Sequence, residues 1–398
     1  MQRDSKVLFL SDHIFSFHGG KAYSYEFAYE NLSIYAELFG KVKVMARYRD
    51  IDPLPPDIPE AEGENVQIVR MENLSTLKSY LNLRRRMARK IEKELRDAEL
   101  LIARLPGEIA LLGIELASEM GKSILAEVAG CAYDMLRHYG GIKATLYAPI
   151  MESRVRRAIK RADAVRYVTD RYLQSRYPPA EGALTASIAG VRLERGDEAG
   201  VQSARERLES LKGDIVLGTI ANIDMRYKGI ERALENFALV KREFPHSIYK
   251  IGGPGERKRY EALCRRLGIE DSVVFDGVLP SRESVRQWLG GIDIYIQPSF
   301  AEGLPRALIE AMGEGCVVVA SNVGGIPEVL DEEFIFDSHS RFGLYSKIKT
   351  LSRRDDLFDI AMENFRLSRK FTADIMDEKR RAFYEEVRDS FASTPGEG

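Results

Sequence analysis

The sequence predicts an α/β fold of two doubly wound domains, and three observations carry this prediction. Short apolar strands alternate with helices of roughly ten or more residues along most of the chain, which is typical of parallel sheets built from βαβ units. The alternation weakens near Val191 and then resumes. The length of 398 residues fits two to three domains of ordinary size. We therefore expect two sheets, with ligands at the carboxyl ends of their strands.

The first series of elements precedes Val191. Apolar runs predict strands at 6–10, 42–46, 66–69, 99–103, 123–128, 164–168 and 184–188. Helical spacing predicts helices at 20–39, 76–97, 107–120 and 150–162. These elements form the expected first domain, residues 1–191, and a polar linker is expected over 192–212.

The second series repeats the same alternation. Strands are predicted at 214–220, 247–251, 272–276, 292–297 and 316–320, and helices at 229–244, 256–267, 283–290 and 306–314. The expected second domain covers residues 213–373, and a charged helix is expected within 374–398.

Composition excludes several classes of protein. With 59 Lys and Arg against 61 Asp and Glu, the net charge is −2, so no whole-protein field attracts nucleic acid. No early apolar run is long enough for a signal peptide or a membrane span. Cys131, Cys264 and Cys316 are far apart and form neither a zinc motif nor a disulfide framework. We expect a cytoplasmic protein with no metal site.

One segment carries most of the chemistry: residues 298–312, PSFAEGLPRALIEAM, which follow an apolar strand. Glu302 lies in the turn, and Glu310 lies one to two turns into the predicted helix. Pro305 suits the first helical turn, where its missing N–H is not needed.

The start of this helix is a predicted anion site. The backbone amides of Gly303 and Leu304 are expected to face outward at the positive end of the helix dipole. The Glu310 carboxylate can accept hydrogen bonds from a vicinal diol, as acidic residues do for ribose in dinucleotide folds. The segment therefore predicts a nucleoside diphosphate, with its phosphates at the helix start and its ribose on Glu310.

The segment from Glu302 to Glu310 resembles the E-x7-E element of the family 4 retaining glycosyltransferases. Four further segments resemble family elements in the family's order: 226–229 (RYKG), 251–255 (IGGPG), 275–279 (FDGVL) and 317–328 (VVVASNVGGIPE). The resemblance implies the GT-B fold, in which two Rossmann-like domains face a central cleft and the C-terminal helix crosses back to the first domain.

The resemblance also implies roles for individual residues. Lys228 would contact the donor diphosphate, and Glu310 would bind the ribose. Glu302 would hold the donor sugar together with the amides of Gly303 and Leu304. The remaining implied donor contacts are Gly253 in the glycine turn, Val278 beside the nucleobase, and Gly19 and Gly20 in the first domain.

The sequence departs from the family pattern at two places. Asn222 stands where many members carry an Arg, and Arg226 is a candidate to supply that charge. The usual His after the strand at 123–128 is missing, and Glu127 is the candidate catalytic replacement. The candidate acceptor residues are Arg104, His18 and His138.

The resemblance implies a retaining, metal-independent hexosyltransferase that needs no cofactor beyond its nucleotide-sugar co-substrate. UDP is the expected nucleotide, and a saccharide or lipid-linked acceptor in bacterial polysaccharide assembly is the expected partner. The segment 164–178 resembles bacterial capsule and exopolysaccharide enzymes. A nucleotide-sugar epimerase and a catalytically weak nucleotide-sugar-binding subunit remain alternatives. Basic helix faces at 84–90 and 154–161 predict peripheral contact with an anionic membrane surface.

Overall fold

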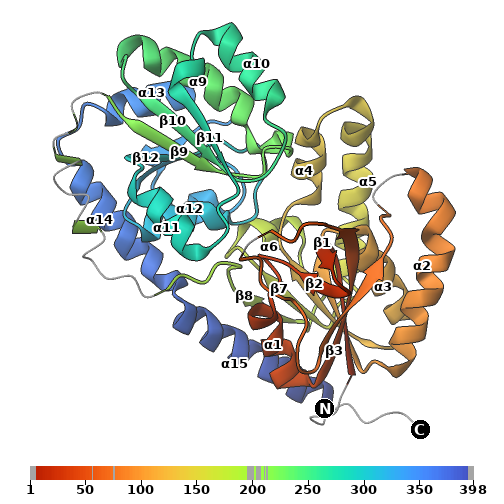
Figure 1. The fold of residues 1–398 in the computed structure, drawn as a ribbon. Helices are drawn as coiled ribbons and strands as arrows, with labels where there is room; N and C mark the ends of the chain where they lie inside the picture. The colour runs from red at the N-terminus through yellow and green to blue at the C-terminus, as the bar shows by residue number, and fades with distance from the viewer. Residues whose placement is uncertain are drawn as a thin grey trace. The chain divides into compact units, whose positions relative to one another are not determined.

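The computed structural model describes residues 6–55, 57–74, 77–194, 201–202, 208–209, 211 and 214–392, apart from the side chains of 77–81 and 392 (Figure 1). The chain divides into two compact units. Unit 1 comprises residues 1–132, 150–188 and 377–398, and unit 2 comprises residues 133–149 and 189–376. Residues 133–149 thus belong to unit 2, although the sequence places them in the first domain. Most of the expected linker and residues 393–398 lie outside the described residues.

Unit 1 is built on a parallel sheet with the strand order β4-β3-β1-β5-β6-β7-β8. The strands are β1 (Lys6–His18), β3 (Lys41–Asp50), β4 (Val66–Met71), β5 (Leu100–Leu105), β6 (Ser123–Val128), β7 (Ala164–Tyr167) and β8 (Leu184–Ser187). The central strands are buried on both faces, which explains why they read as continuous apolar runs instead of alternating.

Helices cover both faces of this sheet. On one face lie α2 (Leu77–Asp97), α3 (Glu108–Glu119) and the end of α5 (Ile142–Ile159), where Arg154 forms an ion pair with Glu108 at 2.7 Å. On the other face lie α1 (Tyr29–Phe39) and α15 (Ala373–Ala392). The rings of Tyr35 in α1 and Tyr384 in α15 have centroids 5.3 Å apart. The C-terminal helix therefore returns to unit 1. Two shorter helices, α4 (Ala132–Tyr139) and α6 (Tyr172–Arg176), complete the first series.

The N-terminal strand is longer than the sequence predicts. It continues past residue 10 to His18 and turns at Gly19 and Gly20 into β2 (Lys21–Tyr23), which pairs with it in the antiparallel direction. Gly19 and Gly20 have φ of 57° and 84°, which suits a two-residue hairpin turn. The predicted helix start at residue 20 is therefore wrong, because this glycine pair closes a hairpin and α1 begins at Tyr29.

Unit 2 is built on a second parallel sheet with the order β11-β10-β9-β12-β13-β14. Its strands are β9 (Val216–Ile220), β10 (Ile248–Gly252), β11 (Val273–Gly277), β12 (Ile294–Gln297), β13 (Val317–Ser321) and β14 (Ile335–Phe336). Its helices are α9 (Ile230–Glu243), α10 (Lys258–Leu267), α11 (Arg282–Gly290), α12 (Arg306–Gly313), α13 (Gly343–Leu351) and α14 (Leu357–Ser368).

The helices of unit 2 form two layers around the sheet. Helices α9, α10 and α13 pack together on one face, and α12 packs with α14 on the other (Figure 1). The strand order reverses between β9 and β12, and such a switch point is where doubly wound sheets bind ligands, beyond the carboxyl ends of the strands. Both sheets are parallel and layered with helices, so the predicted fold class is confirmed.

Candidate functional site

The candidate site lies in unit 2, where the loops that follow β9 and β12 meet. The Phe300 amide donates to the Tyr227 carbonyl at 2.6 Å, which ties the two loops together. Gly229, with φ of 72°, lies so close to the second loop that a Cβ there would be 1.9 Å from the Pro298 carbonyl oxygen. A larger residue at position 229 would push the loops apart, so glycine is what allows their close approach.

The two predicted catalytic residues of these loops are in direct contact. The Lys228 ammonium group lies 2.7 Å from Oε1 of Glu302. Lys228 follows β9 in the short 3-10 helix Arg226–Lys228, whereas Glu302 follows β12, 74 positions later in the chain. The side chain of Glu302 is 8% exposed and that of Lys228 is 20% exposed. The structure therefore pairs a cation and a carboxylate, partly shielded from water, at the switch point of the sheet.

Glu302 is held by neutral donors as well. Gln297 Nε2 donates to its Oε1 at 2.9 Å, and Ser299 Oγ donates at 2.7 Å. Gln297 is in turn fixed by the Tyr295 hydroxyl, which donates to it at 2.9 Å. Burial, followed by the nearby Glu310 and Glu302 charges, keeps the pKa of Tyr295 well above its ordinary value, so this hydroxyl remains a donor. Within the described chain all side-chain partners of Glu302 meet Oε1, so Oε2 remains for a ligand.

The turn after Glu302 leads into α12 and carries the two amides that the sequence predicts to bind an anion. Pro305 is the N-cap of this helix, one residue before the first turn where the sequence predicts it. Within the described chain no acceptor takes the amide protons of Gly303 and Leu304. The carbonyl group of Gly303, unlike its amide, has a partner in the protein: the Gly325 amide donates to it at 2.6 Å.

Glu310 occupies the position expected for a ribose contact. It is the fifth residue of α12, just over one turn from the helix start. One carboxylate oxygen lies 3.7 Å from a guanidinium nitrogen of Arg306, and the Glu310 side chain is 28% exposed. Its partial exposure on the same short helix leaves the carboxylate accessible to a ligand whose phosphates meet the start of α12.

Gly253 and Val278 lie at the carboxyl ends of neighbouring strands. Gly253 has φ of 119°, and a Cβ there would be 2.1 Å from the Ala221 carbonyl oxygen, so only glycine fits. Its amide donates to the Gly277 carbonyl at 2.6 Å. Val278 directly follows β11 and is 51% exposed, an apolar surface suited to the flat face of a base.

Asn222 and Arg226 lie in the loop after β9. The side chain of Asn222 accepts from the Asp224 amide at 3.1 Å, which shapes the loop. Arg226 is exposed, and its aliphatic carbons lie next to Gly140, where a Cβ would be 3.0 Å away. Arg226 thus belongs to the same loop as Lys228, as its expected role requires.

His138 lies closer to this site than the sequence suggests. Its ring stacks on Phe300 with centroids 5.3 Å apart and an interplanar angle of 15°. Its Nδ1 is 3.0 Å from the Asp134 carbonyl oxygen, so the helix α4 fixes the ring. Phe300 precedes Glu302 by two residues. The structure thus brings a predicted acceptor residue to the loop that carries Glu302.

Glu127 is in a different situation from the one predicted. Its side chain is 1% exposed. Oε1 accepts from the hydroxyls of Tyr35 at 2.6 Å and Tyr384 at 2.7 Å, and Oε2 accepts from Arg166 at 2.7 Å and Arg104 at 3.4 Å. Burial would raise the pKa of Glu127, but the charges of Arg166 and Arg104 and the two tyrosine hydrogen bonds outweigh it and lower this pKa to about 2. The predicted sugar contact is therefore wrong, because helices α1 and α15 cover this carboxylate.

The other acceptor candidates lie in unit 1. Arg104 is 20% exposed and contacts Glu26 at 3.4 Å. His18 ends β1, and its Nδ1 lies 3.1 Å from the Ile51 carbonyl oxygen. Gly19 and Gly20 form the exposed β1–β2 turn beside it.

The sequence interpretation missed His13, which lies beside Arg104's partner Glu26. Its Nε2 is 2.8 Å from Ser24 Oγ and its Nδ1 is 3.6 Å from Glu26. Burial lowers the pKa of His13 to about 4, so the ring is neutral at neutral pH. His13 escaped notice because the strand was predicted to end at residue 10, whereas β1 continues through an irregularity between Ser11 and Ile14. The apolar residues Ile14, Phe15 and Phe17 are the sequence signal that the strand continues past residue 10.

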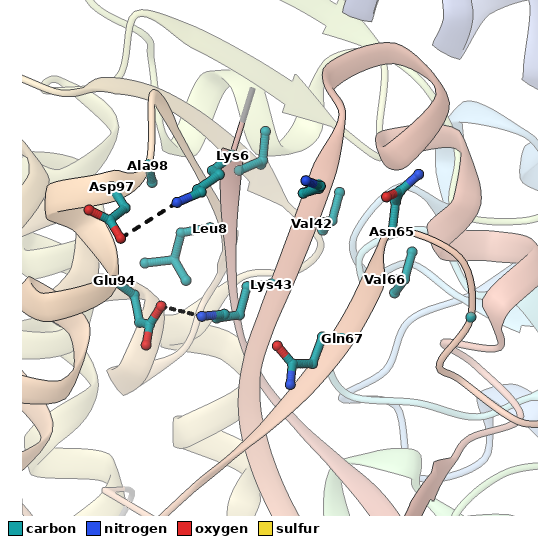
Figure 2. A pocket seen from close by; sticks show the side chains of 13 residues that line it. Lys6, Leu8, Val42, Lys43, Asn65, Val66, Gln67, Glu94, Asp97 and Ala98 are labelled. Atoms are coloured by element: carbon teal, nitrogen blue, oxygen red, sulfur yellow. Dashed lines mark hydrogen bonds and ion pairs between the residues drawn. The ribbon is translucent and has the colours of Figure 1, made fainter. Parts of the chain in front are cut away.

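A hollow of about 340 Å³ lies elsewhere in unit 1, at the amino ends of β1, β3 and β4 (Figure 2). Figure 2 shows Lys6 directed toward Asp97 and Lys43 toward Glu94, so both lysines are paired. This hollow lies at the end of the strands opposite to the one where doubly wound sheets bind ligands, and we assign it no part in the chemistry.

Two kinds of feature are absent from the described residues. No group of three or more His, Cys, Asp or Glu side chains in the described ranges is placed to hold a metal ion. No helix among the described residues is both long and apolar enough to cross a membrane.

Comparisons with known proteins identify the domain that holds this site. Residues 214–353 match the family described as Glycosyl transferases group 1. Protein CapJ of Staphylococcus aureus is 24% identical over 331 residues, which are 83% of this chain and 82% of CapJ. The putative colanic acid biosynthesis glycosyltransferase WcaL of Escherichia coli (strain K12) is 34% identical over 113 residues, which are 27% of this chain and only 28% of WcaL.

Solved structures agree with the fold over nearly the whole chain. Sucrose-phosphate synthase from Thermosynechococcus elongatus has a TM-score of 0.69 at 17% identity, covering 97% of this chain and 100% of that structure. Anabaena Alr3699/HepE in complex with UDP and glucose has a TM-score of 0.65 at 17% identity, covering 98% and 100%. The chain has the GT-B fold, and the site lies within residues 214–353, the part that is similar to the group 1 glycosyltransferases.

Proposed function

We propose that this protein is a retaining glycosyltransferase that moves a hexosyl group from a UDP-linked donor to a saccharide or lipid-linked acceptor in polysaccharide assembly. The observation that carries the proposal is the 2.7 Å contact between Lys228 and Glu302 at the switch point of the second sheet. The choice of a UDP-linked donor is supported by Alr3699/HepE, a structural neighbour that was solved in complex with UDP and glucose. The polysaccharide setting is supported by the name of the relative WcaL. The cysteines are free and buried, in keeping with a reducing cytoplasmic setting.

In this proposal the donor diphosphate lies at the start of α12. The amides of Gly303 and Leu304 donate to its oxygens, and the helix dipole adds positive potential. Lys228 reaches the diphosphate from the neighbouring loop, because an ammonium group has three donors and can meet a phosphate oxygen as well as Glu302. Glu310 accepts from the ribose hydroxyls farther along the same helix.

The reaction breaks the bond between the anomeric carbon and the diphosphate oxygen. Negative charge develops on the leaving oxygen, and Lys228 and the two amides are already oriented to stabilise it. The acceptor hydroxyl forms the new bond on the face that the diphosphate leaves, and its proton passes to the departing phosphate oxygen. Because the leaving group takes the proton, this mechanism needs no strong enzyme base. Because Lys228 and the two amides stabilise the leaving-group charge, it needs no metal ion.

Glu302 serves to position the donor sugar. Its Oε1 is fixed by Lys228, Gln297 and Ser299, which leaves Oε2 to accept from a sugar hydroxyl. A carboxylate held this rigidly orients the anomeric carbon without having to reorganise during the reaction.

The test is donor turnover by the variant Glu302→Gln. We expect the wild type to release UDP slowly from a UDP-sugar without acceptor, and the variant to lose roughly a hundredfold or more of this rate, the scale of a lost preorganised electrostatic contact. Glu314→Gln, just after α12 and paired with Arg286, is the matched control and should keep the rate. Interconversion of the free nucleotide sugar would instead identify an epimerase, and UDP binding without release would identify a binding subunit.

A further inference from the structure

An exposed apolar row runs along the first half of helix α5. Ile142 is 79% exposed, Leu146 is 68% exposed and Ile150 is 54% exposed. Their spacing of four residues places them on one face of the helix. We call these three residues the α5 stripe. Single exposed apolar residues are common, but three large ones in a row on one helix mark an interaction surface.

Positive charge surrounds the α5 stripe. Residues 137–161 contain seven Lys and Arg and one acid, Glu152; one of the seven, Arg154, is paired with Glu108 on α3. Glu152 is 15% exposed and already paired with Arg156 and Arg176. Lys143, beside the stripe, is exposed, and so is Arg157, which continues the same helix face toward its C-terminus. The surface thus combines an apolar row with basic flanks, as helices that lie in a membrane interface do.

Helix α2 shows that positive charge alone does not make such a surface. It contains eight Lys and Arg against four in α5, but Arg84 is paired with Glu115, and Arg86 and Lys90 are paired with Glu72. Among its described side chains, residues 82–97, none is a large exposed apolar residue. Of these two helices, as far as their side chains are described, α5 alone combines the two features.

We propose that the α5 stripe docks on a membrane surface that contains anionic lipids. The three apolar side chains enter the boundary between headgroups and acyl chains, while Lys143 and Arg157 contact lipid phosphates. Anionic lipid fits better than a second copy of the chain, because a two-fold contact would place two strongly basic segments against each other. The proposal is independent of the donor chemistry, but a lipid-linked acceptor would be found at the same surface.

The test is flotation of the full chain with phosphatidylglycerol/phosphatidylcholine vesicles and with pure phosphatidylcholine vesicles, in the absence of nucleotide sugar. We expect binding to the anionic vesicles alone, weakening as salt is added. The double variant Ile142→Gln/Leu146→Gln should bind roughly tenfold more weakly or worse, since buried CH2 groups drive insertion. Lys143→Glu, which changes the charge by two, should weaken binding by a similar factor.

Matched controls separate docking from general surface changes. Phe342→Gln removes a side chain that is 50% exposed elsewhere in unit 2, and Arg266→Glu reverses an exposed charge on α10. Both should bind vesicles like the wild type. All four variants should keep the wild-type rate of UDP release, because none lies in the donor site.

Four outcomes would overturn the proposal. The first is equal binding to both kinds of vesicle, or to neither. The second is a control variant that loses as much binding as the stripe variant. The third is a dimer in sedimentation that the double variant abolishes, which would assign the stripe to a second copy. The fourth is binding to a soluble acidic polysaccharide that needs Lys143 but not Ile142 or Leu146.

Discussion

Two acidic residues of this protein look equivalent in sequence but differ in accessibility. Glu302 and Glu127 each follow or end a buried strand, and each contacts a basic side chain. The oxygen atoms of Glu127 are both taken by protein donors, whereas the described partners of Glu302 all meet Oε1. Burial and pairing alone therefore do not identify a functional carboxylate; an oxygen left for a ligand does.

Lys228→Ala tests the phosphate contact. We expect UDP to bind more weakly by about 1.5–3 kcal/mol, the range of a hydrogen bond to a charged group, and UDP release to slow as well. Isothermal titration with UDP measures the first effect. Lys258→Ala, an exposed lysine at the start of α10, is the control and should leave the affinity as it is. Unchanged affinity of Lys228→Ala would contradict the assignment.

Glu127→Gln tests the structural role of the buried carboxylate. The pKa of Glu127 is lowered from 4.5 to about 2 in the folded state, so the ionised group contributes about 3 kcal/mol of stability at neutral pH. Because the folded pKa is the lower one, this contribution is present above the unfolded pKa and is lost as pH falls from about 4.5 to about 2.

The free energy of unfolding, measured by denaturant titration, should fall by about 3 kcal/mol in Glu127→Gln at neutral pH, because Arg166 is left buried without its partner. The difference from the wild type should shrink in acid. Glu119→Gln, exposed at the end of α3, should change little at either pH. A stable Glu127 variant that loses only UDP release would contradict this assignment and restore the catalytic role.

At the scale of elements, a strand, turn and helix that are consecutive in sequence could be predicted. The burial of a side chain by helices that are distant in sequence could not. The segment 298–312 folds as expected because the signals for the preceding strand, the turn and the helix all lie within residues 294–313. The fate of Glu127 depends on Tyr35 and Tyr384, which lie 92 and 257 positions away. The position of Glu127 at a strand end does not reveal that these two tyrosines bury it. The sequence therefore placed Glu127 in the active site.

The β1–β2 hairpin shows a second feature that the sequence analysis predicted wrongly. Gly19 and Gly20 fit a helix start and a hairpin turn equally well by composition, and the buried pattern of residues 15–17 decides between them. The predicted strand end at residue 10 was wrong as well, and it left His13 outside the strand that holds it.

The loop at Gly324 supports the turn that carries Glu302. Gly324 has φ of 60°, and a Cβ there would be 2.3 Å from the Glu302 carbonyl oxygen. Gly324→Ala must therefore displace this backbone, and we expect the rate of UDP release to fall by roughly a hundredfold, as small misplacements of a positioned group do. Gly121 has a similar φ of 64° but open space around it, so Gly121→Ala reproduces the backbone strain without the collision.

The comparison of these two glycine variants separates strain from displacement. Gly121→Ala should lose about 1 kcal/mol of stability in thermal unfolding, because an alanine is held at positive φ, and Gly324→Ala should lose at least as much. Only Gly324→Ala should lose UDP release. Equal rates in the two variants would show that the turn does not position Glu302.

At the scale of the whole molecule, charge stabilisation in this GT-B protein is proposed to come from the chain itself. Lys228 and the start of α12 come from two loops that the strand order brings to one switch point. If these groups neutralise the leaving diphosphate, transfer should persist in EDTA at the rate seen without chelator. Adding Mg²⁺ back to chelated enzyme should leave UDP release unchanged in the wild type. Complete loss of release in EDTA, restored by Mg²⁺, would mean that Lys228 and the helix start cannot carry the charge alone, and the proposed division of labour between the two loops would fail.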